Sequence, residues 1–454
     1  MREISRSGVL VVYRSFRFLI AAVIAAGSGA FPSVAARAAD PAPPDSALTA
    51  PSAAAEALRA NPELAASAAA IEAARGRLIQ AGLWSNPEIR LAGRSDFAFQ
   101  NEGERNVGVD LEQRFPIAGR LARSRDVARV DVALALAESR EFERTLIGDV
   151  QRAVYGIAAL DAAIASRASV IGTASQLVRA ATHRRQAAEV SDADVNLLEI
   201  ELARFEQEKR RLELERETEA VRLNRLLHRP VDAPVQVSAD LSTPTFAAAR
   251  ATGALARRPD LVRTRLEIDR ARAEAALARA ASWEDWALGV GYENDRQVFK
   301  NEPQSDPIGI KKDDFLGLSV RVPLPLWNRN QGSLIAARAD ERRAQARLAA
   351  AERSAEAEIE TARRRIEELA RVVREYDDSL LPRSQQSVAL LERGYRQGLV
   401  AITALVQAEQ QLADTFLRRA ESLGELRQAE VDLETAAAAS PLLGPPPQSQ
   451  ENRP

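Results

Sequence analysis

Two short stretches of the chain alternate between apolar and charged side chains. Because successive side chains of a β-strand point to opposite faces, residues 87–100 and 107–115 are predicted to be strands with one apolar and one charged face. About ten residues per strand suits a tilted strand that crosses a lipid bilayer with its charged face toward water. An ordinary half-buried sheet would give the same alternation. The apolar positions include Ile89, Leu91, Val107, Val109 and Leu111, and the charged ones include Glu88, Arg90, Asp110, Glu112 and Arg114.

Long helices are predicted where the chain runs without proline from Gly119 to Pro230. The first is expected at 121–186, a length of about 100 Å at 1.5 Å per residue. After a turn at 187–191, a second helix at 192–228 is expected to return antiparallel to the first. Branched aliphatic side chains recur every seventh residue, which indicates a coiled-coil seam. They are Val150, Ile157, Ile164, Ile171 and Val178.

The same strand-to-helix pattern occurs twice in the chain, 209 residues apart. VGVDLEQRFPIAGR at Val107–Arg120 aligns with LGLSVRVPLPLWNRNQG at Leu316–Gly332, with a proline of each copy in register. We therefore predict two structural repeats, at 53–238 and 239–437. The hydrophobic seam recurs with the same offset at Ile359, Ile366, Val373 and Leu380.

The second repeat is expected to hold strands at 286–293 and 315–322 and helices at 331–393 and 401–437. Its charged segment 293–314 is longer than the counterpart in the first repeat and is predicted to be a long loop. A proline inside the first of these helices, Pro382, is expected to kink it.

The two ends of the chain differ in composition from the repeats. Residues 1–38 resemble a secretory signal peptide, with a basic start, a short apolar run and small residues before a cleavage site. A true membrane anchor is the alternative. Residues 39–52 are predicted to be an extended leader, and 438–454 a disordered Pro-rich tail. Elsewhere no run of about 18 apolar residues suggests a transmembrane helix.

Composition narrows the possible functions. The formal net charge is -2 and acidic and basic side chains interleave along the predicted helices, so no nucleic-acid-binding surface is indicated. The absence of cysteine excludes disulfides, cysteine nucleophiles and a lipid-modified N-terminal cysteine. His183 and His228 have no neighbouring ligands at metal-binding spacing. No nucleophile–base motif or phosphate loop occurs, so we expect no catalysis, no cofactor and no bound metal.

Large aromatic side chains gather at the strand ends that adjoin the predicted helices. Tryptophan prefers the membrane–water interface, which favours an interfacial aromatic belt at these ends. Clustering in a small soluble core is the alternative. The residues are Trp84, Phe115, Trp283, Trp286 and Trp327.

Four strands per chain are too few to close a barrel. An open sheet edge in hydrocarbon would leave backbone groups unpaired, at a cost of several kcal/mol each. Three chains would supply twelve strands, an even number within the range of outer-membrane barrels. We therefore expect a homotrimer in which the helices form a second tube that continues the first.

Two sequence segments, one at each strand-to-helix junction, resemble those of a known protein family. PLPLWNRNQG at 323–332 and QRFPIAGR at 113–120 resemble the TolC-like outer-membrane efflux family, and are most similar to its heavy-metal (cobalt–zinc–cadmium) resistance subgroup. The resemblance covers 53–437. It implies a trimer of a β-barrel and an α-helical barrel, which docks through periplasmic adaptor proteins to a proton-driven inner-membrane pump of the RND type.

Residues at the strand-to-helix junctions could be structural or could contribute to transport. We interpret them as turn and helix N-cap residues, since asparagine accepts hydrogen bonds from free N–H groups and glycine permits a tight turn. They are Pro116, Gly119, Arg120, Pro325, Asn328, Arg329, Asn330, Gln331 and Gly332.

The tips of the two helix pairs are candidates for a periplasmic aperture and for the adaptor contact. The resemblance implies an acidic ring at the second tip, but Ala404 and Gln407 stand at the matching positions. The first tip offers Asp192 and Asp194 instead, although Ser191-x-x-Asp194 is also a capping box. The predicted aperture and adaptor residues are Asp192, Asp194, Arg396 and Gly398.

Together these observations predict a mainly α fold with a small β part, located in the outer membrane with a large periplasmic part. The expected function is a passive exit duct for metal cations in a tripartite efflux system. The same duct serving multidrug efflux or type I protein secretion is the alternative, and a soluble periplasmic coiled-coil adaptor or scaffold is a third. Adaptor, pump and outer-membrane lipid are the expected partners.

Overall fold

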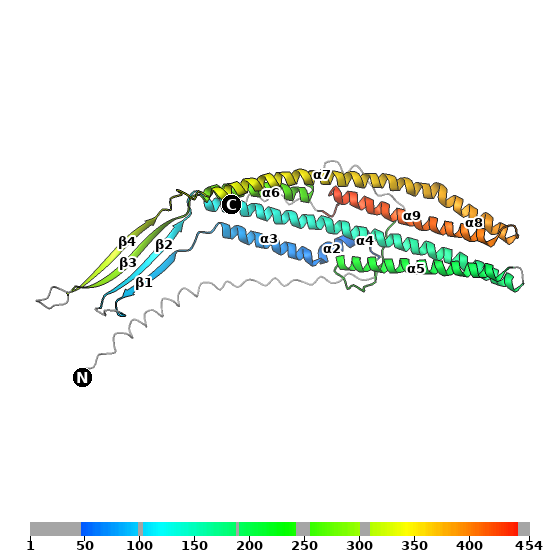
Figure 1. Cartoon of the computed structure of the whole chain (residues 1–454), viewed down its shortest axis with the longest axis horizontal. Coiled ribbons are helices and arrows are strands. Elements are labelled where there is room, and N and C mark those ends of the chain that lie inside the picture. Colours follow the sequence, from blue (N-terminus) through cyan, green and yellow to red (C-terminus); the bar gives the residue numbers. More distant parts are fainter. Residues whose placement is uncertain (1–46, 99–102, 188–189, 242–254, 300–308, 444–454) are drawn as a thin grey trace, which may run out of the picture. The chain divides into compact units, whose positions relative to one another are not determined.

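A computed structural model describes residues 47–98, 103–187, 190–241, 255–299 and 309–443. The predicted signal peptide, most of the predicted leader and most of the predicted tail lie outside the described residues. Figure 1 shows a small sheet and a set of long helices. The helices are α2 (Ala50–Ala60), α3 (Pro62–Ala81), α4 (Arg120–Gln186), α5 (Asp192–Leu226), α6 (Pro259–Ala280), α7 (Gln331–Glu375), α8 (Leu381–Arg396) and α9 (Ile402–Ala436). The strands are β1 (Glu88–Ser95), β2 (Arg105–Phe115), β3 (Trp286–Phe299) and β4 (Gly309–Arg321).

The end of the predicted leader is helical rather than extended. Thr49 is the N-cap of α2, and its side chain accepts a hydrogen bond from the Ser52 backbone N–H, while Ser52 Oγ accepts one from the Thr49 N–H at 2.9 Å. This reciprocal capping box starts the helix at Ala50, two residues before the predicted leader ends. Just before it, Leu48 forms an isolated parallel bridge with Val237.

The four strands form one antiparallel sheet in the order β1-β2-β3-β4. The register places the predicted apolar side chains on one face and the predicted charged ones on the other. β1 and β4 are the edges of this sheet in a single chain. One apolar row is Ile89, Leu111, Val290 and Leu318, and the adjacent polar row is Glu88, Glu112, Gly289 and Ser319.

The prediction of a long loop at 293–314 is wrong, because most of it extends β3 and β4. Asp295 pairs with Asp313 in the ladder, and Asp314 accepts hydrogen bonds from Tyr292 Oη and Asn294 Nδ2, both at 2.7 Å. Charged residues indicated a loop because the apolar alternation stops there. The backbone ladder nevertheless continues, since it needs no apolar side chains when both faces meet water or polar partners.

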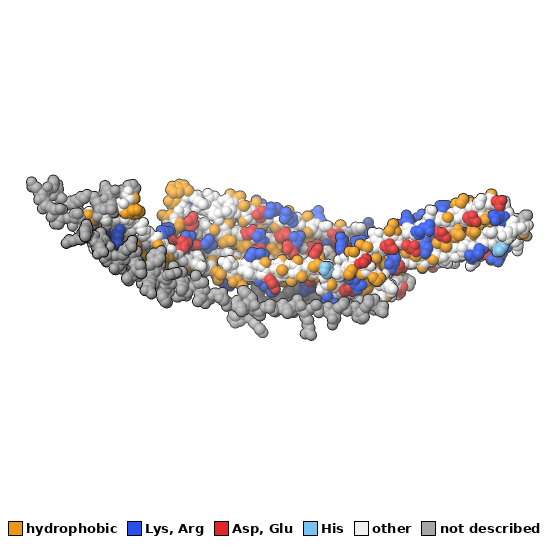
Figure 2. All heavy atoms as spheres, turned by 90° about the horizontal axis from the view of Figure 1, so that it is seen from below, with side chains coloured by type: hydrophobic (Ala, Val, Ile, Leu, Met, Phe, Trp, Pro, Cys, Tyr) orange, Lys and Arg blue, Asp and Glu red, His pale blue; other side chains and the backbone are white. Residues whose placement is uncertain are grey.

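The long helices pack through the predicted heptad seam. Val150 and Ile157 of α4 are fully buried in a core shared with α2 and α5, and Ile366 and Val373 of α7 are buried against α9. Acidic and basic side chains are interspersed along the helical surface visible in Figure 2. Several form pairs one helical turn apart, such as Lys209 with Glu213 at 2.9 Å.

One part of α4 is apolar enough over its length to meet a composition criterion for a membrane span, contrary to the sequence expectation. Its apolar side chains include Val154 and Ile157, which are buried among other helices rather than turned outward. A third of this window is buried in the single chain, so the core accounts for part of its apolar composition.

The helix predicted at 331–393 is helical throughout and extends to Arg396, but its hydrogen-bond pattern changes within it. α7 ends at Glu375, Tyr376–Leu380 is π-helical, and α8 continues to Arg396. The predicted seam ends before Leu380, which is 40% exposed. Pro382 lies in the first turn of α8, where its missing N–H is tolerated.

Candidate functional site

The polar face of the sheet carries paired charges beside its helix-side end. Arg114 lies 3.2 Å from Glu88, and Arg321 lies 2.9 Å from Glu112, with each ion pair joining two strands. All four side chains are partly exposed, so water can reach them. A face of paired, hydrated charges suits contact with an aqueous passage and not with lipid.

Glycines on the same face leave room for the polar side chains of neighbouring strands. A Cβ on Gly291 would overlap the carboxylate of Asp110, and one on Gly289 would overlap the hydroxyl of Ser319. Small residues on one face also allow strands to curve toward that face. The polar face is therefore the one that can line a narrow interior.

The opposite face of the sheet is apolar and uncovered in a single chain. Leu316 is 81% exposed and Leu318 is 77% exposed. Such a contiguous apolar surface on an isolated soluble protein would be unfavourable. It matches the hydrocarbon of a membrane.

The predicted interfacial aromatics lie where the chain passes between helix and strand. Trp84 precedes β1 and packs edge-to-face on Phe115 at the end of β2, with ring centroids 5.7 Å apart. Trp286 pairs with Phe115 in the ladder, and Trp327 follows β4 with 87% of its surface exposed. Trp283 lies three residues before the start of β3 and is also exposed.

The junction from β2 to α4 uses Gly119 at φ +70° as the helix N-cap. This left-handed conformation favours glycine. Arg120, the first residue of α4, forms an ion pair with Asp285 just before β3, and so ties the β2–α4 junction to the α6–β3 junction. Pro116 follows β2 directly, where a strand can end without a ladder N–H.

The second junction, between β4 and α7, is a turn held by hydrogen bonds among its own residues. Asn328 Oδ1 accepts from the Asn330 N–H at 3.1 Å, and Gln331 Oε1 accepts from the Arg329 N–H at 2.8 Å. Arg329 Nε in turn donates to the Pro325 carbonyl at 3.3 Å. These contacts are those of a structural turn.

Two details of the predicted junction are wrong. Asn330 is the N-cap of α7 at φ +57°, but its side chain does not accept from the helix; its Nδ2 donates to the Ala278 carbonyl of α6 at 2.9 Å. The amide therefore satisfies the end of a neighbouring helix. Gly332 lies within the first turn of α7 and not in the preceding turn.

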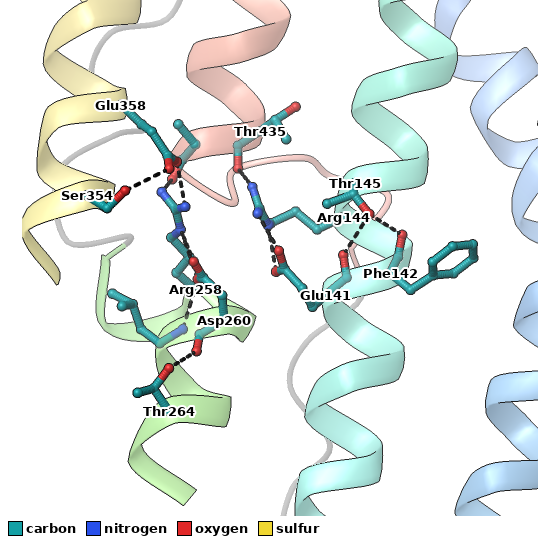
Figure 3. A network of polar contacts seen from close by, with 12 residues as sticks. Glu141, Phe142, Arg144, Thr145, Arg258, Asp260, Thr264, Ser354, Glu358 and Thr435 are labelled. Atoms are coloured by element: carbon teal, nitrogen blue, oxygen red, sulfur yellow. Dashed lines mark hydrogen bonds and ion pairs between the residues drawn. The ribbon is translucent and has the colours of Figure 1, made fainter. Parts of the chain in front are cut away.

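Sequence reasoning missed a network of arginines at the C-terminal end of α9 (Figure 3). Arg258 Nη1 donates to the Ala436 carbonyl at 3.0 Å, and Arg144 Nη1 donates to the Thr435 carbonyl at 2.7 Å. Cations at a helix C-terminus are favourable because the last carbonyls lack intrahelical partners. Carboxylates balance both charges: Glu141 for Arg144, and Asp260 with Glu358 for Arg258.

A sequence signal for this network existed in the repeat. Arg258-Pro259 matches Asn61-Pro62, and Asn61 Nδ2 donates to the Leu226 carbonyl at the end of α5 at 3.3 Å. In both repeats the residue before the helix-starting proline thus caps the end of the return helix.

At the first helix tip the predicted capping contact is present. Ser191 Oγ accepts from the Asp194 N–H at 3.2 Å and contacts the Asp194 carboxylate at 2.8 Å. Asp192 is 83% exposed and lies 3.5 Å from Arg185 at the end of α4. Ser191 therefore caps α5, whereas Asp192 is exposed and ion-paired with Arg185.

At the second tip the contacts fix the turn. Gly398 at φ +74° lets its N–H bond to the Tyr395 carbonyl and the next N–H, of Leu399, bond to the Gly394 carbonyl, a Schellman motif. Arg396 is paired with Glu392 within α8. The two tips touch where the Arg184 guanidinium lies 5.2 Å from the Tyr395 ring centroid.

Within the described ranges, no group of three or more His, Asp or Glu side chains is arranged to hold a metal ion. His183 lies in the last turn of α4, and His228 follows α5 in a left-handed conformation at φ +56°.

The fold is similar to those of solved channel and outer membrane proteins. CusC, whose structures concern folding and transmembrane channel formation, superposes with a TM-score of 0.71 at 16% identity, covering 86% of this chain and 91% of that one. The outer membrane protein VceC of Vibrio cholerae gives 0.68 at 17% identity, over 86% and 95%. The open state of the MtrE outer membrane channel of Neisseria gonorrhoeae gives 0.65 at 17%, over 86% and 88%. No curated protein sequence matches.

The family is shown by a match of the sequence to a protein-family profile. Residues 53–228 and 252–439 match the profile of the outer membrane efflux proteins, in two segments that agree with an internal repeat. These segments cover most of the chain. It therefore belongs to the outer membrane efflux protein family, whose members are passive efflux channels, not enzymes, of the Gram-negative outer membrane with a large periplasmic helical part.

Proposed function

We propose that three copies of this chain form the exit duct of a tripartite efflux pump, joined to an inner-membrane pump of the RND type through periplasmic adaptors. The observation that carries the proposal is the sheet, with one exposed apolar face, one paired-charge face and two unpaired edges, continuous with the long helices. A membrane-embedded sheet must pair its edges, and a second and third copy supply them. Twelve strands would then close around the polar face.

The helices support the same assembly through an uncovered apolar row on α5. Ile200, Leu214 and Val221 lie on one face of α5 at multiples of seven residues, and are 60%, 63% and 48% exposed. On an isolated helical protein, this row would face water along much of the helix.

The internal repeat indicates what covers this row. The residues that match Leu214 and Val221 on α9, 210 positions later, are Gly424, which lies against Ala159 of α4, and Val431, which is 3% exposed. Gln410 matches Ile200. In one chain α9 thus packs on α4, whereas α5 lacks the equivalent neighbour. The repeat counterpart of α4 is α7, so we infer that α7 of a second copy covers α5.

A substitution pair tests the assembly. Leu214→Glu with Val221→Glu should convert the purified trimer to monomers, measured by native mass spectrometry in detergent, because two carboxylates would be buried against the second copy. The matched control, Leu214→Met with Val221→Ile, keeps the apolar surface and should remain trimeric. A trimer that tolerates both glutamates would contradict this interface.

Metal cations are the proposed cargo class. The resemblance of PLPLWNRNQG to the heavy-metal subgroup supports it, as does the exposed carboxylate of Asp192 at the tip. Multidrug efflux or type I secretion through the same duct is the alternative. Co-expression with a metal pump or a drug pump in a strain lacking its own duct separates these cargoes. We expect restored growth on cobalt, zinc or cadmium, and not on drugs.

The carboxylates at the first helix tip can be tested in the channel alone, without pump or adaptor. Asp192→Asn should lower the cation selectivity of single channels in a planar bilayer, because it removes an exposed negative charge at the proposed entrance. Asp194→Asn keeps the backbone N–H that Ser191 caps, and should change selectivity less because the Asp194 carboxylate is engaged by the Ser191 hydroxyl. Equal selectivity in wild type and both variants would remove the aperture role.

A soluble periplasmic scaffold is the third alternative. Such a protein would be found in the soluble fraction, and not with the membranes, after cell fractionation.

A further inference from the structure

Three basic residues lie side by side on the apolar face of the sheet, at the end away from the helices (Figure 1). In the ladder Arg105 of β2 pairs with Arg296 of β3, which pairs with Lys312 of β4. Each lies six residues along its strand from the apolar row that contains Leu111, and therefore on the same face. Neighbouring strands are about 4.8 Å apart, so these three positions, the basic row, span about 10 Å.

The basic row is not neutralised by the part of the chain that the structure describes. Among those residues, none of the three cations forms an ion pair, and Arg296 Nε has no hydrogen-bond partner. Arg105 and Lys312 are exposed, whereas Arg296 is half-buried. Like charges directly opposite each other on adjacent strands repel. An anion from outside the chain would relieve this repulsion.

The next row of the ladder, on the polar face, has a different composition. It mixes Arg94 with Asp295 and Asp313, and Asp313 also pairs with Lys311 at 2.8 Å. The carboxylates and cations of that face thus lie together, as suits an aqueous interior.

On the apolar face, the carboxylate one row nearer the helices is already engaged. It belongs to Asp314, which accepts hydrogen bonds from Tyr292 Oη and Asn294 Nδ2, both at 2.7 Å. The single sign of the basic row is therefore a property of its own position at the end of the apolar face.

The length of β2 indicates the depth of the basic row in a membrane. Phe115, which pairs with Trp286 in the predicted aromatic belt, lies ten residues from Arg105. Ten residues extend about 33 Å along a strand, or about 25 Å in height at the tilt of a membrane barrel. The apolar band of such a barrel is also about 25 Å tall. With the helices in the periplasm, the basic row lies at the head groups of the outer leaflet.

We propose that the basic row binds the phosphate groups of lipids in the outer leaflet of the outer membrane. Guanidinium and ammonium groups form strong, charge-assisted hydrogen bonds with phosphate oxygens, and the apolar rows below contact the acyl chains of the same lipid. A row about 10 Å long can contact two phosphates at once, which favours a head group that carries two. This inference rests on the proposed function in one respect, that the apolar face meets lipid.

Lipid binding to the purified full-length protein in detergent, followed by native mass spectrometry, tests the inference. The lipid is lipid A with two phosphates, compared with lipid A with one phosphate and with inorganic phosphate. Arg105→Gln with Lys312→Gln should weaken binding of the diphosphorylated lipid about 25-fold, since each cation near an anionic lipid surface contributes about fivefold. The loss of one lipid phosphate should weaken binding to the wild type.

Two matched variants control for folding and for charge. Arg94→Gln with Lys311→Gln removes the same charge from the polar face of the same sheet and should leave the affinity unchanged. Arg105→Lys with Lys312→Arg keeps both charges on the apolar face and should bind as the wild type does. Circular dichroism and the mass of the assembly show whether each variant folds.

The other outcomes separate the basic row from the duct. Unchanged binding after Arg105→Gln with Lys312→Gln would overturn the inference, and so would equal weakening by the polar-face variant. Competition by inorganic phosphate at the concentration of the lipid would mean a site for free phosphate and would also overturn it. A monomeric, non-conducting protein that still shows the expected lipid preference would overturn the proposed duct and leave the basic row standing.

Discussion

The two helix pairs of this chain follow one hydrophobic pattern but differ in the continuity of their helices and in how many side chains they bury. α4 runs unbroken for 67 residues beside α5, with buried side chains along most of its length. Its counterpart is divided into α7, a π segment and α8, and the last part buries little. Buried residues match at an offset of 209 in Ile157 and Ile366 but of 210 in Leu223 and Leu433, so the second copy holds one extra residue. The π segment accounts for it, because an inserted residue in an α-helix must be absorbed by a wider turn. Repetition of a pattern therefore does not imply equal rigidity.

The largest expected effect comes from the shared seam. Ile157→Ala should lower the free energy of unfolding by about 4 kcal/mol, because the side chain is fully buried. The matched Ile366→Ala should cost about 2 kcal/mol, since that side chain keeps partial access to solvent. Thermal unfolding of the trimer, followed by circular dichroism, measures both. Equal losses would mean that the two seams contribute equally to the free energy of unfolding.

The caps of the return helices provide the second comparison. Arg258→Ala should destabilise the protein by about 3 kcal/mol, because Asp260 and Glu358 would lose their buried cation along with the Ala436 carbonyl contact. Asn61→Ala removes one neutral hydrogen bond to Leu226 and should cost about 1 kcal/mol. Urea unfolding compares the two. A smaller loss for Arg258→Ala than for Asn61→Ala would contradict the buried charge network.

A third comparison concerns pH. Burial, and then the nearby Glu392, raise the pKa of Glu409 above its ordinary value of 4.5. The folded form holds this proton more tightly than the unfolded form, so its contribution favours folding at low pH and is lost as pH rises through the raised pKa. Glu409→Gln should therefore stabilise the protein at neutral pH and flatten the pH dependence of its thermal midpoint. Glu199→Gln on α5, the exposed counterpart 210 residues earlier, should leave both unchanged.

The smallest expected effect lies at the matching ends of α5 and α9. His228 and Ala438 adopt positive φ, which costs a residue with a Cβ roughly 1 kcal/mol. His228→Gly and Ala438→Gly should each stabilise the protein by about 0.5 kcal/mol, after the entropic cost of glycine in the unfolded chain. Differential scanning calorimetry should resolve the shift, and a loss of stability in either variant would show that its side chain makes contacts worth more than the strain.

The sequence alone was informative where a period of side chains meets a defined surface. Alternation in 87–100 and 107–115 predicted both strands and their faces, although β1 ends earlier, at Ser95. The proline-free run predicted α4 to within one residue of its start. It failed at 293–314, where charge replaced alternation although the backbone ladder continued. It also failed at Leu380, because a seven-residue count does not reveal an inserted residue in the intervening turn.

Local patterning determined the strands, the long helices, their turns and the two-fold repeat, because each follows from neighbouring side chains and their spacing. Only the tertiary structure decided which helix end Asn330 satisfies, how Arg144 and Arg258 meet the end of α9, and where the spare residue is absorbed. Those outcomes depend on groups brought together from distant parts of the chain, whose hydrogen bonds and packing no local period records.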